Sequence, residues 1–234
     1  MLLDLTQTLE EDVPYPAVCP PPSFGTVLDN RADDPLNVQQ FSLSTHTGTH
    51  IDAVRHRFPD GESIDELPLE RFTGESVVLD VSREEAGPVD AADLAAAVDR
   101  DDLSIRPDDV VLLYMGWGDK YGTDEYEIHP WLTTDAAAWL VDREVSLVGM
   151  DTITPDVPGP HRSDDWAETE RWPVHEVLLG GDVLIAENLV NLDRIAGERV
   201  AVTAFPLKIR DGDGAQTRFV AETEHRVAPD EPRS

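Results

Sequence analysis

Apolar residues in this chain occur mainly in short runs of strand length, separated by turn residues and charged segments. These runs predict β-strands at residues 2–6, 38–44, 76–81, 110–115, 146–150, 183–186, 199–205 and 217–221. The pattern therefore predicts a fold that is built mainly on a β-sheet.

Two stretches have clear helix signals. Asp90 can cap an Ala-rich helix over 91–98, and Thr133 or Thr134 can cap a helix over 135–143. The second of these helices lies between two predicted strands. Strand, helix and strand together indicate a βαβ unit with parallel strands.

A third, shorter helix is expected to begin at Pro173, because proline suits the first helical turn, and to end at Gly180 and Gly181. No Ser/Gly-rich linker or internal repeat divides the chain. We therefore predict an α/β fold with a mixed β-sheet and few helices, forming a single domain over residues 1–227. Residues 228–234 carry prolines and mixed charges and are predicted to be a frayed C-terminal tail.

The composition adds a strong acidic bias. The 234 residues include 48 Asp or Glu and only 18 Lys or Arg, which gives a formal net charge of −30. Such a chain repels phosphate backbones and anionic membrane surfaces, so nucleic acid and membrane are excluded as partners. High charge is also typical of disorder, but 40% of the residues are hydrophobic, which favours a folded protein with an acidic surface.

Lysine is nearly absent, since only Lys120 and Lys208 occur. Acidic excess with little lysine is typical of proteins from salt-rich cytoplasm, where molar salt shortens the Debye length to about 3 Å and screens self-repulsion. A single cysteine, Cys19, excludes an internal disulfide and suits a reducing compartment. The N-terminal residues do not resemble a signal peptide. We predict a cytoplasmic protein of a halophilic archaeon.

Three histidines and an aspartate are concentrated in one short segment, with the pattern H-x3-H-x-D-x3-H formed by His46, His50, Asp52 and His56. The β-branched residues between them favour an extended chain. A bend at Gly48 is needed, because a flat strand would hold the first two histidines about 13 Å apart. Two imidazoles and a carboxylate suit Zn²⁺ or Mn²⁺. The alternative is a polar loop with solvated histidines.

His175 and Glu187 form a second candidate pair. His175 lies on the predicted short helix, and Glu187 directly follows a strand that looks buried, where a bare carboxylate would be very costly. Each could instead be structural, with the histidine bonded to a backbone carbonyl and the glutamate to an arginine. Asp151 and Lys208 also follow strands, and for both we favour a structural or surface role.

The segment around His46 closely resembles the signature of the cyclase family of metal-dependent hydrolases, which includes bacterial kynurenine formamidases (arylformamidases) and isatin hydrolases. Further matching segments run in the family's order and cover nearly the whole chain; they lie at residues 64–68, 147–152, 173–175, 185–189 and 205–208. The resemblance implies a swivelling β/β/α fold and a homo-oligomer, either a dimer or a tetramer.

The resemblance also implies a site for divalent metal, Zn²⁺ or Mn²⁺, with two ions per subunit. His46, His50 and Asp52 match the ligands of the first ion. Asp52 and Glu187 would bridge to a second ion, which His175 also binds.

His56 matches the family's catalytic acid/base. The sequence departs from the family pattern at Val54, where a proline is usual, and at Arg57, where an aromatic residue is usual. Tyr15 stands where the formamidases place a tryptophan against the aromatic substrate, so it is a candidate substrate-binding residue.

The predicted function is that of a metal-dependent amidohydrolase, an enzyme acting on carbon–nitrogen bonds other than peptide bonds. Its small-molecule amide substrate would be N-formylkynurenine, cleaved to kynurenine and formate in tryptophan catabolism by metal-activated water. One alternative is hydrolysis of a cyclic amide or lactone, and another is a non-catalytic metal-binding protein. A serine or cysteine hydrolase is not indicated, because no G-x-S-x-G elbow occurs and Cys19 lies in a run of prolines.

Overall fold

The computed structural model describes residues 1–11, 13–15, 19–32, 34–159 and 172–223. The predicted tail over 228–234 lies outside the described residues. The strands are β1 (Leu2–Asp4), β2 (Ser23–Leu28), β3 (Val38–Ser42), β4 (His50–Asp52), β5 (Thr73–Asp80), β6 (Pro88–Val89), β7 (Val110–Tyr114), β8 (Trp131–Leu132), β9 (Leu147–Met150), β10 (Leu184–Glu187), β11 (Arg199–Thr203), β12 (Gly214–Gln216) and β13 (Val220–Glu222). The α-helices are α1 (Ala91–Arg100), α2 (Thr134–Val141) and α3 (Pro173–Gly180).

Nine strands form one mixed sheet in the order β1-β13-β11-β5-β7-β9-β10-β4-β12. The four central strands, β5, β7, β9 and β10, are parallel, and the strands on both sides of them pair antiparallel. Helix α2 connects the parallel strands β7 and β9, so the predicted βαβ unit is confirmed. The predicted single α/β domain with a mixed sheet is confirmed as well. In the described part of the chain, no helix is both long and apolar enough to cross a membrane.

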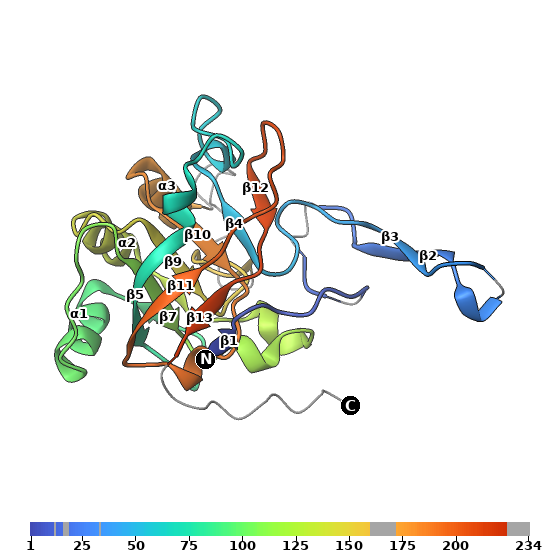
Figure 1. Ribbon diagram of the computed structural model, residues 1–234. Helices are drawn as coiled ribbons and strands as arrows, with labels where there is room; N and C mark the ends of the chain where they lie inside the picture. Colours follow the sequence, from blue (N-terminus) through green and yellow to red (C-terminus); the bar gives the residue numbers. More distant parts are fainter. Residues whose placement is uncertain (12, 16–18, 33, 160–171, 224–234) are drawn as a thin grey trace.

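The central strands are buried on both faces, which explains their continuous apolar runs. In β7, Val111 and Leu113 pack in the cluster that includes the helix residues Leu94 and Leu140. Figure 1 shows the three helices on this side of the sheet. Val110 and Leu112 point the opposite way, into a second cluster formed largely by β-strands and loops. The parallel strands thus form the well-packed centre of the sheet, and the antiparallel strand β4 pairs with β10 beside them.

The helices begin where their capping residues predict. Asp90 accepts a hydrogen bond from the backbone N–H of Asp93, and the Asp93 side chain accepts one from the Asp90 backbone, which completes a capping box. Thr133 caps α2 by accepting from the N–H of Ala136. Pro173 occupies the first turn of α3, as predicted.

A hairpin formed by β2 and β3 projects from the body of the protein as an arm (Figure 1). The sequence predicted β3, but it did not predict β2, because Ser, Gly and Thr interrupt its apolar residues. The predicted strand at 217–221 also differs: residues 217–219 lie between the short strands β12 and β13, and only residues 220 and 221 belong to β13. Strand β2 pairs locally and was missed because its apolar pattern is weak, whereas β12 and β13 pair with β4 and β1, which lie far from them in the sequence.

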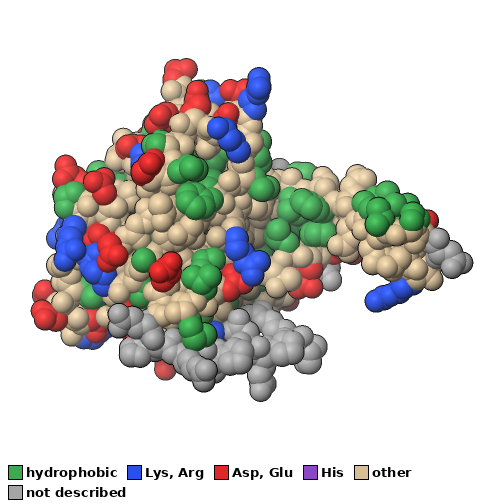
Figure 2. All heavy atoms as spheres, viewed as in Figure 1, with side chains coloured by type: hydrophobic (Ala, Val, Ile, Leu, Met, Phe, Trp, Pro, Cys, Tyr) green, Lys and Arg blue, Asp and Glu red, His purple; other side chains and the backbone are tan. Residues whose placement is uncertain are grey.

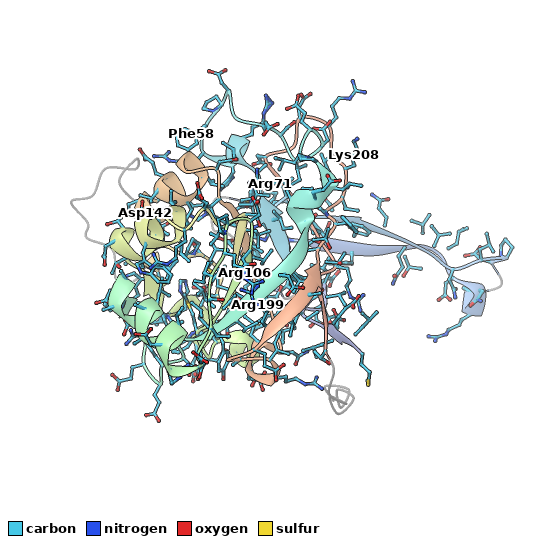
Figure 3. All side chains as sticks on the ribbon, turned by 60° about the vertical axis from the view of Figure 1, so that its left-hand side comes forward. Phe58, Arg71, Arg106, Asp142, Arg199 and Lys208 are labelled. Atoms are coloured by element: carbon cyan, nitrogen blue, oxygen red, sulfur yellow. The ribbon has the colours of Figure 1, made fainter. Side chains whose placement is uncertain are left out.

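Charged side chains at strand ends are mostly structural or exposed. Arg199 of β11 makes a paired contact with Asp109, from Nη1 to Oδ1 at 2.9 Å and from Nη2 to Oδ2 at 2.8 Å. Figure 3 shows Arg199 over the sheet and Lys208 at the periphery of the molecule. Lys208 is exposed, in agreement with its predicted role as a surface charge.

Asp151, at the end of β9, anchors a neighbouring loop. Its buried carboxylate accepts hydrogen bonds from the backbone N–H groups of four successive residues: Met115, Gly116, Trp117 and Gly118. Burial raises the pKa of Asp151 to about 6, and the amide donors oppose that rise. The favoured structural role of Asp151 therefore agrees with its contacts.

Asp151→Ala is expected to lower the free energy of unfolding by about 3 kcal/mol, because it leaves several buried amides unsatisfied. Urea unfolding in molar KCl measures this change. Asp119→Ala, which removes an exposed carboxylate from the same loop, is the control and should change stability by less than about 0.5 kcal/mol. Equal unfolding midpoints for the two variants would contradict the assigned role.

Candidate metal centre

The turn ahead of β4 brings two of the predicted ligands together. Gly48 has a φ of 68°, a left-handed conformation that glycine adopts without a Cβ clash. The ring centroids of His46 and His50 are 5.1 Å apart. The predicted bend at Gly48 is therefore present.

Strand β4 carries the centre of the site between β10 and β12. His50 and Asp52 are fully buried, and Glu187 of β10 lies directly opposite His50 in the antiparallel register. His50 Nε2 lies 3.3 Å from Asp52 Oδ1 and 3.3 Å from Glu187 Oε2. Strand pairing alone thus places one imidazole against two carboxylates.

Helix α3 adds His175 from the other side. Its Nε2 lies 3.4 Å from Asp52 Oδ2 and 3.5 Å from Glu187 Oε1. His46 completes the group, with Nδ1 2.7 Å from Asp52 Oδ1. The structure therefore brings together all five side chains that the sequence predicted as metal ligands.

In each of the three imidazoles, one ring nitrogen contacts a hydrogen-bond partner outside the cluster and the other faces the carboxylates. These pairs are His50 Nδ1 with the carbonyl of Gly48 at 2.8 Å, His175 Nδ1 with Asp156 Oδ2 at 2.6 Å, and His46 Nε2 with Asp213 Oδ2 at 2.9 Å. Metal-binding histidines are usually oriented in this way, by an acceptor on the nitrogen that does not bind the metal. The arrangement therefore leaves one nitrogen of each ring facing a carboxylate of the cluster, at Asp52 or Glu187.

Three buried polar atoms of this cluster fit a bound cation. His50 Nε2, Asp52 Oδ2 and Glu187 Oε1 are buried and make no well-aligned hydrogen bond with any described residue. Buried polar atoms are rarely left this way, because an unsatisfied group loses its hydration without compensation. Three imidazole nitrogens and two carboxylates facing one another are also donors that suit Zn²⁺ or Mn²⁺.

The carboxylates hold protons on the imidazoles in the metal-free protein. Burial alone would lower the pKa of His46 and His50, but the neighbouring carboxylates together outweigh burial and raise these pKa values to about 9 and about 10; Asp52 and Asp213 act on His46, and Asp52 and Glu187 act on His50. Burial also acts to lower the pKa of His175, and its hydrogen bond to Asp156 helps raise it well above its usual range. A metal must therefore displace protons when it binds, so its affinity rises with pH.

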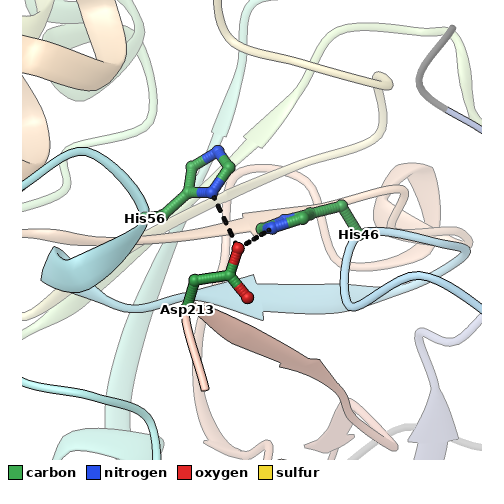
Figure 4. A group of neighbouring side chains, drawn as sticks. All are labelled: His46, His56 and Asp213. Atoms are coloured by element: carbon green, nitrogen blue, oxygen red, sulfur yellow. Dashed lines mark hydrogen bonds and ion pairs between the residues drawn. The ribbon is translucent and has the colours of Figure 1, made fainter. Parts of the chain in front are cut away.

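His56 lies at the rim of this cluster, in a short 3₁₀ turn (Val54–His56) directly after β4. His56 is exposed, and its ring packs on the ring of His46 with centroids 4.0 Å apart. Figure 4 shows the Asp213 carboxylate between the rings of His46 and His56. His56 is thus accessible to solvent and adjacent to the buried ligands, which is where an acid/base can meet a substrate.

Tyr15, the predicted substrate-binding residue, lies elsewhere in the described structure. It lines a surface hollow together with residues such as Val13, Cys19 and Thr123. None of the residues lining that hollow belongs to the metal cluster. A contact between Tyr15 and substrate therefore stays a prediction.

Two residues of the site were missed by the sequence analysis. Asp156 accepts hydrogen bonds from the N–H groups of Val174 and His175 as well as from the His175 ring. Asp213 contacts His46 and lies near His56. In a chain with 48 acidic residues, no local signal distinguishes these two.

Comparisons with known proteins show the family to which the chain belongs. Residues 3–157 match the family described as putative cyclase. The chain is 32% identical to the kynurenine formamidase of Erythrobacter litoralis (strain HTCC2594) over 93% of this chain and 91% of that protein. It is 34% identical to the kynurenine formamidase of Salinibacter ruber (strain DSM 13855 / M31), over 88% and 87% of the two chains. Among solved structures, isatin hydrolase A from Ralstonia solanacearum superposes with a TM-score of 0.82 at 28% identity, covering 94% of this chain and 91% of that chain.

The relatives and structural neighbours show that this chain is a metal-dependent hydrolase, and its cluster of histidines and carboxylates could hold a metal ion. The chain belongs to the cyclase family. The prediction of an enzyme of this class, an amidohydrolase acting on carbon–nitrogen bonds other than peptide bonds, is thereby confirmed.

Proposed function

We propose that this enzyme hydrolyses an aryl formamide of the N-formylkynurenine type, releasing the aromatic amine and formate. The observation that carries the proposal is the convergence of His50 Nε2, Asp52 Oδ2 and Glu187 Oε1 beside the exposed His56. The relatives named kynurenine formamidase, at 32% and 34% identity over most of the chain, support this choice of substrate.

We infer that two divalent ions, Zn²⁺ or Mn²⁺, are held per chain. His46, His50 and Asp52 would hold the first ion, and His175 would hold the second, with Asp52 and Glu187 shared between them. The two oxygens of Asp52 support this division, because Oδ1 faces His46 and His50 while Oδ2 faces His175. When bound, such ions lower the pKa of water toward about 7 and stabilise the oxyanion that develops on the carbonyl.

Proton transfer is assigned to His56. His56 would accept a proton as water adds to the formyl carbon, and would return it to the nitrogen as the C–N bond breaks. The amine then leaves neutral and the formyl group leaves as formic acid, which releases its proton to solvent and becomes formate, so atoms and charge balance. The buried carboxylates of Asp52 and Glu187 would hold the ions and need not take up the proton.

A cyclic amide or lactone is the alternative substrate. The isatin hydrolase structure, with a TM-score of 0.82, favours it, as does Tyr15 where the formamidases place a tryptophan. The same residues would then open a ring, and both fragments would stay in one product. The chemistry at the carbonyl is shared, so substrate shape decides between the two.

An assay of metal-reconstituted protein in molar KCl tests the proposal. N-Formylkynurenine and isatin are each supplied with Zn²⁺ or with Mn²⁺ present. We expect hydrolysis of the formamide with the higher kcat/KM. Faster hydrolysis of isatin would establish the alternative, and no hydrolysis of any amide or lactone by metal-loaded protein would leave a non-catalytic metal-binding protein. Molar salt is used because the charge of −30 suits a salt-rich cytoplasm, where we propose the enzyme works.

We further propose that the enzyme is a homo-oligomer, a dimer or a tetramer, assembled through the β2–β3 arm. All residues of β3 are exposed, and an isolated two-stranded hairpin is only marginally stable in water. Phe24 and Phe41 stack across the arm with centroids 6.0 Å apart, and Phe41 is 60% exposed. Figure 2 shows apolar side chains gathered along the arm. Neither strand carries a charged residue, so a second copy of this acidic chain can approach the arm without repulsion at the contact.

The double variant Phe24→Ser/Phe41→Ser is expected to be monomeric at micromolar concentration, because it removes the apolar pair from the proposed contact. Light scattering coupled to size-exclusion chromatography measures the mass. Gln40→Ala, an exposed change on the same arm, is the matched control and should keep the mass of the oligomer. A monomeric wild-type protein, or a double variant that assembles normally, would contradict the role of the arm.

A further inference from the structure

Asp213 is fixed against the metal-binding strand by its backbone. It directly precedes β12, in which Gly214 lies opposite Asp52 of β4. A Cβ at Gly214 would lie 2.8 Å from the carbonyl oxygen of Ile51, so only glycine permits this close approach. The carbonyl of Asp213 accepts a hydrogen bond from the N–H of Ala53 at 2.9 Å. Ala53 is the residue from which the short turn carrying His56 begins.

The Asp213 carboxylate is also held in place. Its Oδ1 accepts a hydrogen bond from the hydroxyl of Thr45 at 2.9 Å. Its Oδ2 lies 2.9 Å from His46 Nε2 and 3.5 Å from His56 Nδ1 (Figure 4). The hydrogen bond to His46 helps hold the pKa of Asp213 well below its usual range. One oxygen of a fixed carboxylate therefore faces two imidazoles, one buried and one at the rim.

The rim position makes this contact important for His56. Its side chain is 32% exposed, so packing covers only part of the ring. A ring nitrogen of His56 lies within 4.8 Å of a carboxylate oxygen of Asp52 and a ring nitrogen of His175. A carboxylate on Nδ1 favours the tautomer with the proton there, which leaves Nε2 unprotonated and able to act as a base.

We propose that Asp213 is the positioning residue for His56: its Oδ2 holds the Nδ1–H and thereby fixes the orientation and tautomer of the ring beside the metal cluster. This inference rests on the proposed role of His56 as acid/base. It differs from a structural role for Asp213, and from a role that acts on metal binding through His46 alone.

Kinetics of the zinc-loaded enzyme separate these roles. Excess zinc keeps the site loaded when the contact of Asp213 with His46 is lost. Under this condition Asp213→Ala is expected to lower kcat roughly 10- to 100-fold, part of the total contribution of a general acid/base, with little change in KM. In a His56→Ala background the same substitution should have no further effect on kcat, because two residues that act as a unit are not additive. Asp211→Ala removes a largely exposed carboxylate two residues away and is the matched control.

A readout without turnover completes the test. Nitrogen NMR of the histidine rings in the zinc-loaded protein should show His56 protonated on Nδ1 in the wild type, and a shift towards the Nε2–H tautomer in Asp213→Ala. Wild-type kcat in Asp213→Ala together with an inactive His56→Ala would overturn this inference alone. Additive losses in the double variant would also overturn it, in favour of a role through His46. Full activity of His56→Ala would overturn the proposed mechanism and this inference together.

Discussion

Asp52→Ala is expected to yield protein that retains little or no divalent metal after dialysis and that has less than about one-thousandth of the wild-type turnover. Asp52 is fully buried, and its two oxygens face imidazoles on opposite sides, His46 through Oδ1 and His175 through Oδ2. The substitution therefore removes the carboxylate that both ions would share. Glu187→Ala should have the same kind of effect, because the Glu187 carboxylate faces both His50 and His175.

Elemental analysis of metal per chain measures this loss directly. Asp52→Asn is the partner variant, since it keeps the side-chain volume but removes the charge, and it should also lose metal. Asp60→Ala, an exposed change close in the sequence, should retain metal and activity. Wild-type metal content in both Asp52 variants would contradict the assignment of Asp52 as a ligand.

His56→Ala is expected to separate metal binding from catalysis. The exposed His56 lies outside the five proposed ligands, so the variant should bind metal as the wild type does. It should lose roughly 10²- to 10⁴-fold in kcat, the usual contribution of a general acid/base. Metal content and kcat are measured on the same preparation. A variant with wild-type turnover would remove His56 from the mechanism, and one that loses its metal would indicate that His56 is a ligand instead.

The core of the site was predictable from sequence because its signals are local. His46, His50 and Asp52 lie within one short segment, and the bend that joins them needs only Gly48. Glu187 was a candidate because a carboxylate at the end of a buried strand requires partners, and the family resemblance then implied that it is a metal ligand. Its register opposite His50 then follows from the pairing of β4 with β10.

Asp213 and Asp156 could not be predicted in this way. Asp213 reaches the site only because β12 pairs with β4 across a long stretch of chain, and Asp156 only because it meets the start of α3. One strand of the arm was also not predicted from the sequence. Strand β2 has a weak apolar pattern. It is stabilised by pairing with β3 and, as we propose, by contact with a second copy of the chain.

The most direct test of the account is a titration of metal-free protein with Zn²⁺ or Mn²⁺ in molar KCl, in which bound metal and hydrolysis of N-formylkynurenine are measured on the same samples. The account predicts no hydrolysis by metal-free protein, and activity that rises with bound metal and reaches its maximum at two ions per chain. Undiminished hydrolysis by metal-free protein would contradict it.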